Sequence, residues 1–312
     1  MKVIFMGTPD FAVYSLKALL TEHEVLAVVT QPDKPKGRGK KVLFPPVKEF
    51  ALEQGLAVHQ PPKVREEEFV ELLRSYQPDV IAVTAFGQIL PESILSLPKY
   101  GCINVHGSLL PKYRGAAPMQ WAIIDGEETT GITTMYMAKG MDTGDMLLKT
   151  EIPLSQEDNF ATVHDKLAQA GADLLLETLK GLEAGTLERH PQDHALATHA
   201  PMLTKETGHI LWEEKTGQEI INLMRGLSPA PGAFTIYEDA PLKIFGASIV
   251  EDSDDFTGAS PGEVVAVNKK SFVVRTRDAA LEILEVQAQG GKRMATDAYL
   301  RGHEMKTGMV LK

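Results

Sequence analysis

Two side chains that can stabilise and move charge, those of Asn104 and His106, stand two positions apart in the stretch Cys102–Gly107. Residues i and i+2 of a strand share a face, so an apolar strand here presents the amide and the imidazole together. An amide N–H can stabilise an oxyanion, and an imidazole can share that charge and exchange protons. A buried histidine beside a structural asparagine is the alternative interpretation. The Gly/Pro-punctuated loop that follows, which holds Lys112 and Arg114, favours a functional site.

A third candidate, Asp142, is flanked by two glycines in the segment Lys139–Asp145, after an expected strand at Ile132–Met137. This pattern predicts a tight loop that places one carboxylate. An Asx-type turn is the alternative, and it suits Asp145 better than Asp142. A carboxylate can orient an imidazole and favour its charged form, so amide, imidazole and carboxylate can run acyl transfer without a covalent intermediate. No G-x-S-x-G, HExxH or CxxC motif accompanies them, so we expect direct transfer between two bound substrates and no catalytic metal.

The elements that must position these residues alternate between short apolar runs and amphipathic helical patterns. Continuous Val/Ile-rich runs are typical of parallel strands that are covered on both faces. Strands that alternate with helices predict an α/β fold with a doubly wound, Rossmann-like, mostly parallel sheet, whose carboxyl edge is where ligands bind. The expected strands are 2–7, 24–31, 79–87, 101–107 and 132–137, and the expected helices are 9–22, 45–55 and 160–185.

The second half of the chain has a different pattern. Residues 189–205 lack sustained periodicity and contain two prolines, which predicts a linker over the surface. One helical stretch at 216–227 is followed by several short strands with turn signals between them, which is typical of a small β-barrel. We therefore expect a catalytic domain at 1–188, a linker at 189–205, and a smaller C-terminal, OB-like barrel at 206–312.

The first strand ends at Gly7 without the glycine fingerprint of a dinucleotide-binding fold. The G-x-G-x-x-G pattern is absent, and Asp10 would repel a phosphate placed at the start of the next helix. This argues against a nicotinamide or flavin dinucleotide. Thr8 is expected to cap that helix, with Pro9 at its first position.

Composition bounds the class of protein. The chain has 312 residues, 43% of them hydrophobic, and a single cysteine, Cys102, which excludes an intramolecular disulfide. No apolar run approaches the ~18 residues of a membrane span, so a cytoplasmic protein without a membrane partner is expected. The net charge of −10 argues against nucleic acid, yet the segment Lys34–Lys41 holds five cations and no acid. An acidic protein with such a basic island is compatible with an RNA partner.

The stretches "NVHGSLLPKYRGAAP" (104–118) and "GMDTGD" (140–145) resemble the formyltetrahydrofolate-dependent formyltransferases. "MGTPDFA" near the start, "TQPDKPKGRGKK" after the second strand, and "LSPAPGAF" (227–234) extend this resemblance over nearly the whole chain, toward members that act on charged tRNA. The resemblance implies that Asn104, His106 and Asp142 are the catalytic residues. It further implies a folate-binding set, Phe86, Gly87, Gln88, Ile89, Leu90, Ser108, Leu109, Leu110 and Pro111, and a tRNA-binding set, Arg38, Lys40 and Lys41.

The resemblance also implies the reaction. The expected formyl donor is 10-formyltetrahydrofolate, acting as a co-substrate. The expected acceptor is the α-amino group of methionyl-initiator tRNA, held by the C-terminal barrel of a monomeric enzyme that supports translation initiation. Formylation of another amine, such as a nucleotide-linked amino sugar, and hydrolysis of formylfolate stay open as alternatives within the family. A non-catalytic RNA-binding module is a third alternative, but it leaves the three polar residues without a purpose.

Overall fold

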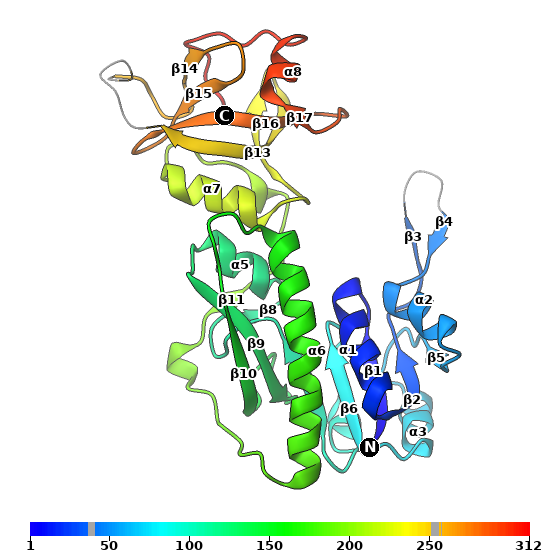
Figure 1. Ribbon diagram of the computed structural model, residues 1–312. Coiled ribbons are helices and arrows are strands. Elements are labelled where there is room, and N and C mark those ends of the chain that lie inside the picture. Colours follow the sequence, from blue (N-terminus) through cyan, green and yellow to red (C-terminus); the bar gives the residue numbers. More distant parts are fainter. Residues whose placement is uncertain (37–40, 251–255, 257) are drawn as a thin grey trace. The chain divides into compact units, whose positions relative to one another are not determined.

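A computed structural model describes residues 1–36, 41–250, 256 and 258–312. The chain forms two compact units (Figure 1). The first comprises residues 1–118, 129–153 and 164–201, and the second comprises 119–128, 154–163 and 202–312. The functional boundaries at 188 and 205 stay a prediction.

The first unit is built on a mixed sheet in the order β10-β9-β7-β6-β1-β2-β5. The five strands from β7 to β5 run parallel, whereas β9 is antiparallel to both β7 and β10. The predicted Rossmann-like, mostly parallel sheet is confirmed. Its strands are β1 (Lys2–Gly7), β2 (Glu24–Val29), β5 (Val58–His59), β6 (Val80–Thr84), β7 (Cys102–His106), β9 (Thr129–Tyr136) and β10 (Met146–Pro153).

Helices cover both faces of this sheet, as a doubly wound fold requires. On one face, Ser15 of α1 bonds to Thr84, and Gly171 of α6 lies against Val105. On the other face, side chains of α3 and α4 join the apolar core around Ile4, Ile81 and Cys102. The helices are α1 (Asp10–Glu22), α2 (Pro46–Glu53), α3 (Glu67–Ser75), α4 (Glu92–Leu95) and α6 (Phe160–Ala184), of which α3 and α4 are additional to the predicted elements.

Three small elements complete the first unit. The basic segment contains a short antiparallel hairpin of β3 (Lys34–Lys36) and β4 (Lys41–Leu43). Strands β8 (Arg114–Gly115) and β11 (His199–Ala200) pair in parallel and tie the segment after α6 to the loop after β7. A short 3-10 helix, η1 (His194–Leu196), precedes β11.

The second unit is an antiparallel sheet in the order β12-β13-β16-β15-β14, with β17 paired to β16. The C-terminal residues bridge the two edge strands: Lys312 exchanges backbone hydrogen bonds with Ile236 of β12 (2.6 and 3.0 Å), and Met309 O accepts from Val264 of β14 (2.8 Å). The elements are β12 (Ala233–Tyr237), β13 (Ala240–Val250), β14 (Val264–Val267), β15 (Phe272–Arg275), β16 (Ala280–Ala288), β17 (Met294–Ala295), α5 (Pro118–Ile124), η2 (Glu206–Gly208), α7 (Gly217–Gly226) and α8 (Thr296–Leu300).

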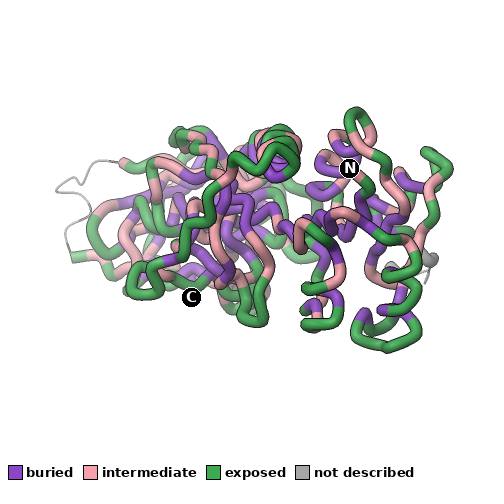
Figure 2. Tube along the Cα trace, turned by 90° about the horizontal axis from the view of Figure 1, so that it is seen from below, coloured by how far each residue is buried: buried purple, intermediate pink, exposed green. Residues whose placement is uncertain are grey.

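Each unit has its own apolar core, and Figure 2 shows buried stretches of the chain in the interior with exposed segments around them. The first unit buries Ile4, Met6 and Ile81 completely, and the second buries Ile244, Phe272 and Ile283 completely. Among the described residues, no helix combines the length and the apolarity needed to cross a bilayer.

Candidate active site

His106 ends β7 with its imidazole held in one tautomer. Its Nε2 lies 2.9 Å from the carbonyl oxygen of Tyr113. A carbonyl can only accept, so Nε2 carries a hydrogen and donates it. The other nitrogen, Nδ1, faces Asp142 Oδ2 at 3.7 Å. Nδ1 is therefore the nitrogen that can gain and lose a proton.

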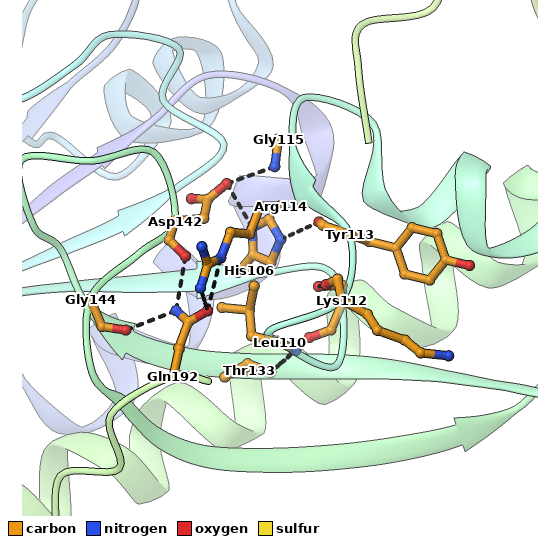
Figure 3. A network of polar contacts seen from close by, with 11 residues as sticks. His106, Leu110, Lys112, Tyr113, Arg114, Gly115, Thr133, Asp142, Gly144 and Gln192 are labelled. Carbon is orange, nitrogen blue, oxygen red and sulfur yellow. Dashed lines mark hydrogen bonds and ion pairs between the residues drawn. The ribbon is translucent and has the colours of Figure 1, made fainter. Parts of the chain in front are cut away.

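Asp142 lies in the loop 138–145 between β9 and β10, called the Asp142 loop below. This loop brings its carboxylate close to His106. Its Oδ2 accepts a hydrogen bond from the backbone N–H of Gly115 at 2.9 Å (Figure 3). The distance of 3.7 Å to His106 Nδ1 is too long for a direct hydrogen bond, so this pair is an electrostatic contact that a water or a reacting group can bridge. Their side chains are only 6% and 16% exposed, respectively, so the attraction is screened less than on the surface.

Asn104 lies on β7 one i,i+2 step before His106, as predicted. Asn104 pairs with Met135 and His106 pairs with Thr133 in the antiparallel register of β7 and β9. Val105, between them, points to the opposite face, toward Gly171 of α6. Asn104 and His106 therefore share the face away from α6, and Asn104 is half-buried rather than enclosed.

The predicted folate-binding residues form two loops at the carboxyl ends of β6 and β7, which are parallel neighbours. The loop 108–111 is fixed by side chains: Thr133 Oγ1 donates to Ser108 O (2.7 Å) and accepts from Leu110 N (3.1 Å), and Lys149 Nζ donates to Leu110 O (2.5 Å). Ser108 Oγ donates to Lys112 O (2.7 Å). The loop is therefore preorganised, with its backbone polar groups already oriented.

The loop 85–90 is held by the carbonyl of Phe86 and by the side chain of Gln88. Phe86 O accepts from Thr8 Oγ1 (2.9 Å) and Gln31 Nε2 (3.2 Å), and Gln88 Oε1 accepts from Val64 N (3.0 Å). Ile89, by contrast, is 76% exposed. The prediction that Thr8 caps α1 is wrong: the helix begins at Asp10 without a side-chain cap, because the Thr8 hydroxyl bonds across to the loop after β6.

The predicted tRNA-binding residues are not all described. Arg38 and Lys40 lie outside the described residues, and for Lys41 the structure describes the backbone, in β4, but not the side chain. At the base of the hairpin, Lys48 Nζ bonds to Asp33 Oδ2 (2.6 Å) and Gln60 Oε1 (2.7 Å). Gln60 Nε2 also donates to Asp33 Oδ1 at 2.8 Å. The bonds that Asp33 accepts from Lys48 and Gln60 hold the pKa of its carboxyl below its usual value.

Gln192, which the sequence did not indicate, and Arg114 complete the polar network. Gln192 bonds to the backbone of the Asp142 loop and accepts from Arg114, which is itself buried (Figure 3). Arg114 lies in the loop after β7, which the sequence already indicated as part of a functional site. Gln192 lies in the segment expected to be a linker and carries no sequence signal. The thiol of Cys102, earlier on β7, is buried, and burial raises its pKa to about 12. That excludes it as a nucleophile near neutral pH.

The chemistry of this arrangement is that of proton exchange beside a stabilised negative charge. The half-buried amide and the imidazole can both face a developing oxyanion, and the carboxylate can support a positive charge on Nδ1. No group of three or more His, Cys, Asp or Glu side chains is placed to hold a metal ion within the described part of the chain.

Comparisons with known proteins agree on one family. The formyl transferase family matches residues 1–179, and the formyl transferase C-terminal domain matches residues 202–304. The methionyl-tRNA formyltransferase of Acetivibrio thermocellus is 51% identical over 100% of this chain and 99% of its own length. That of Caldanaerobacter subterraneus subsp. tengcongensis is 53% identical over the full length of both chains.

Solved structures share the fold at lower identity. HypX from Aquifex aeolicus, in complex with tetrahydrofolic acid, superimposes with a TM-score of 0.64 at 19% identity, covering 99% of this chain and 50% of that one. An N-formyltransferase from Helicobacter canadensis, in complex with folinic acid and dTDP-3-aminofucose, gives a TM-score of 0.65 at 18% identity, covering 91% and 98%. At these identities the likeness concerns the fold alone.

Proposed function

The chain belongs to the formyl transferase family, and we propose that it transfers the formyl group of 10-formyltetrahydrofolate to the α-amino group of methionyl-tRNA. The observation that carries this proposal is the approach of His106 Nδ1 to Asp142 Oδ2 at the sheet edge where the loops after β6 and β7 begin. The full-length relatives that carry the same activity in their names support the acceptor.

The reaction follows from the placement of the three polar residues. The amine attacks the formyl carbon, a C–N bond forms, and the carbonyl electrons move onto oxygen. Asn104 donates its amide N–H to that oxyanion, and His106 shares its charge. The amine loses a proton through the His106–Asp142 pair, N10 of the folate gains one, and the bond from the formyl carbon to N10 breaks. Each such donor is typically worth about 3 kcal/mol in the transition state.

The two loops after β6 and β7 hold the folate in this proposal. The exposed Ile89 offers apolar surface for its ring system, and the bonds to Thr133 and Lys149 hold the backbone of residues 108–111 in one conformation. The basic segment Lys34–Lys41, with Arg38, Lys40 and Lys41, and the C-terminal barrel hold the tRNA in this proposal, mostly through phosphates. In this proposal the formyl acceptor is methionyl-initiator tRNA.

The function is tested by mixing the purified protein with 10-formyltetrahydrofolate and methionyl-initiator tRNA, and measuring formylmethionine by mass together with tetrahydrofolate by absorbance. A charged elongator methionyl-tRNA is the parallel substrate. Formate release without any amine would instead indicate a formylfolate hydrolase. Formylation of a nucleotide-linked amino sugar but not of tRNA would show that the acceptor is an amino sugar.

The tRNA role of the hairpin has its own test. Arg38→Ala removes a fork-shaped cation that can contact phosphate or base, so kcat/KM for methionyl-tRNA should fall severely while folate affinity holds. Lys40→Ala and Lys41→Ala should each flatten the salt dependence of kcat/KM by about one phosphate contact. If Arg38→Ala weakened folate binding and spared the tRNA kinetics, the hairpin would belong to the other substrate.

A further inference from the structure

The segment 189–200 crosses the edge of the first unit, and most of it is exposed. Two of its residues are buried: Gln192, which is 6% exposed, and Ala200 in β11. The segment contacts both loops of the candidate site. His190 exchanges backbone hydrogen bonds with Met146 (2.9 Å each) at the end of the Asp142 loop, and β11 pairs with β8 in the loop after β7. Gln192 lies between these two attachments.

The carboxamide of Gln192 uses all of its hydrogen-bonding capacity. Its Nε2 donates to the carbonyl oxygens of Asp142 and Gly144, each at 2.8 Å. Its Oε1 accepts from Nε and Nη2 of Arg114 at 3.0 and 2.6 Å. Two N–H groups and two lone pairs are all that an amide offers. A flipped amide would set oxygen against two carbonyls and NH₂ against a guanidinium, so only one orientation fits.

The backbone that Gln192 holds is strained. Asp142 has φ = +51°, in the left-handed region that costs a non-glycine residue roughly 1 kcal/mol or more. Such a conformation persists when surrounding contacts determine it. Gln192 holds the main-chain oxygen of Asp142, and Gly115 N–H holds its carboxylate. These two bonds aim Asp142 Oδ2 at His106 Nδ1.

The bonds from Gln192 to the carbonyls of Asp142 and Gly144 form a clamp on the Asp142 loop. Arg114 connects this clamp to the rest of the site. Its neighbours in sequence contact both catalytic side chains through the backbone: Tyr113 O accepts from His106, and Gly115 N donates to Asp142. The Arg114 guanidinium reaches the Asp142 loop only through Gln192 in the contacts of the described residues. One tripeptide thus orients the imidazole, the carboxylate and, by way of Gln192, the loop that carries the carboxylate (Figure 3).

We propose that Gln192 is a positioning residue for formyl transfer: its carboxamide locks the Asp142 loop to Arg114, and this sets the carboxylate against His106 Nδ1. The inference rests on the function proposed above. All four side-chain hydrogen bonds of Gln192 go to protein groups, so its loss should act on the chemical step and spare substrate binding.

The test variant is Gln192→Glu. A carboxylate still accepts from Arg114, which keeps the buried guanidinium paired, but it has no N–H for the carbonyls of Asp142 and Gly144. We expect kcat to fall about 10- to 100-fold through misplacement of the loop, with both KM values within about threefold of wild type. Gln192→Met, which also removes both bonds from Arg114 to Oε1 and leaves the guanidinium with His194 Nδ1 at 3.2 Å, should lose the same kcat and additional thermal stability.

Asn222 provides a matched control in the second unit, on α7. It is 7% exposed, and its Oδ1 accepts from Arg225 Nη1 at 3.0 Å, as Gln192 accepts from Arg114. Asn222→Asp makes the same change of amide to carboxylate beside an arginine. It should leave kcat within about twofold of wild type, because it makes none of the contacts to the Asp142 loop.

A double-mutant cycle separates positioning from general damage. If Gln192 acts through Asp142, the effect of Gln192→Glu on kcat should shrink below about threefold in the Asp142→Asn background. The ring-nitrogen NMR signals of His106 give a readout that does not need the reaction, and Gln192→Glu should shift them in the direction that Asp142→Asn does. Asn222→Asp should leave these signals in place.

The outcomes are distinct. A Gln192→Glu kcat within threefold of wild type, an undiminished loss in the Asp142→Asn background, or an equal loss in Asn222→Asp would each overturn the positioning role. If the wild-type protein formylates no amine, the proposed function fails. The His106 signals then decide the geometry alone, and unchanged signals in Gln192→Glu would overturn the clamp as well.

Discussion

The loop after β7, residues 107–117, is held in part by its own residues, whereas the loop 138–145 depends on partners far along the chain. Within the first loop, Ser108 Oγ bonds to Lys112 O and Lys112 N bonds to Leu109 O, and Thr133 and Lys149 add further bonds. Asp142 in the second loop is held by Gly115 and by Gln192, which lies 50 positions away.

This difference has an energetic consequence. A loop with several independent bonds loses only part of its order when one bond is removed, and a typical intramolecular hydrogen bond contributes about 1 kcal/mol. Asp142 depends on two partners for its position, and it loses that position when either partner changes. Substitutions at the Asp142 loop should therefore have larger effects on kcat than comparable substitutions in the loop after β7.

The largest effect should come from Asp142→Asn. The amide oxygen can still accept from Gly115 N, so the loop keeps its shape, but the negative charge beside His106 Nδ1 disappears. We expect kcat to fall at least about 100-fold, since charge in a shielded site is worth several kcal/mol. The pH–rate profile of both proteins should also differ in shape, because the imidazolium loses its partner. An unchanged rate with an unchanged profile would show that the two side chains do not act together.

A smaller but still large effect is expected from Gly144→Ala. A Cβ at this position would lie 1.9 Å from the carbonyl oxygen of Tyr136, a backbone atom that cannot rotate away. The loop must therefore shift, and with it the carbonyl that Gln192 holds. We expect kcat to fall about 10- to 100-fold with little change in folate affinity. Gly302→Ala is the control for a glycine substitution, since nothing lies within 4 Å of a Cβ there and its φ is outside the left-handed region.

Ser108→Ala tests the better-supported loop. It removes the bond to Lys112 O, while the bonds from Thr133 and Lys149 remain. We expect KM for the folate to rise about fivefold, the equivalent of one hydrogen bond near 1 kcal/mol, with kcat within twofold. A kcat loss as large as that of Gly144→Ala would show that kcat is equally sensitive to substitutions in the two loops.

Local patterns predicted the parts of this site that depend on near neighbours. The apolar run ending in Asn104-x-His106 predicted a strand with both side chains on one face, and β7 has that form. The two glycines around Asp142 predicted a tight loop, and the pair His106–Asp142 lies together as expected.

Patterns of this kind cannot predict partners that the fold brings from a distance. Thr8 has the residue type and place of a helix cap, but a carbonyl 78 positions away takes its hydroxyl. Gln192 lies among prolines and charges with no periodicity, and it reaches the Asp142 loop through the bonds between His190 and Met146 and the pairing of β11 with β8. Phe69, Val70 and Leu73 in α3 have helical spacing in the sequence, but the segment is so short that this spacing did not lead to the prediction of a helix.

The smallest expected effect concerns Cys102, which lies on β7 two residues before Asn104. Its reactivity reports whether β7, the strand before the loop 107–117, stays closed. Burial raises the pKa of its thiol to about 12, whereas an unfolded cysteine has a pKa near ~8.5. At pH 8 the folded protein then holds a thiolate fraction on the order of 1 in 10,000, against about a quarter in the unfolded chain. Because the folded pKa is the higher one, the thiol favours folding at neutral pH, and that contribution declines as pH rises above ~8.5.

Alkylation of native protein with iodoacetamide at pH 8 should therefore be very slow, and denaturant should restore the ordinary rate. The same slow labelling is expected in Asp142→Asn and Gly144→Ala, since their damage is confined to the Asp142 loop and β7 stays closed. Fast labelling of the native wild-type protein would mean that β7 opens readily. Fast labelling of the Gly144→Ala protein alone would mean that the Asp142 loop and β7 unfold as one unit, and the two loops would then not be held independently.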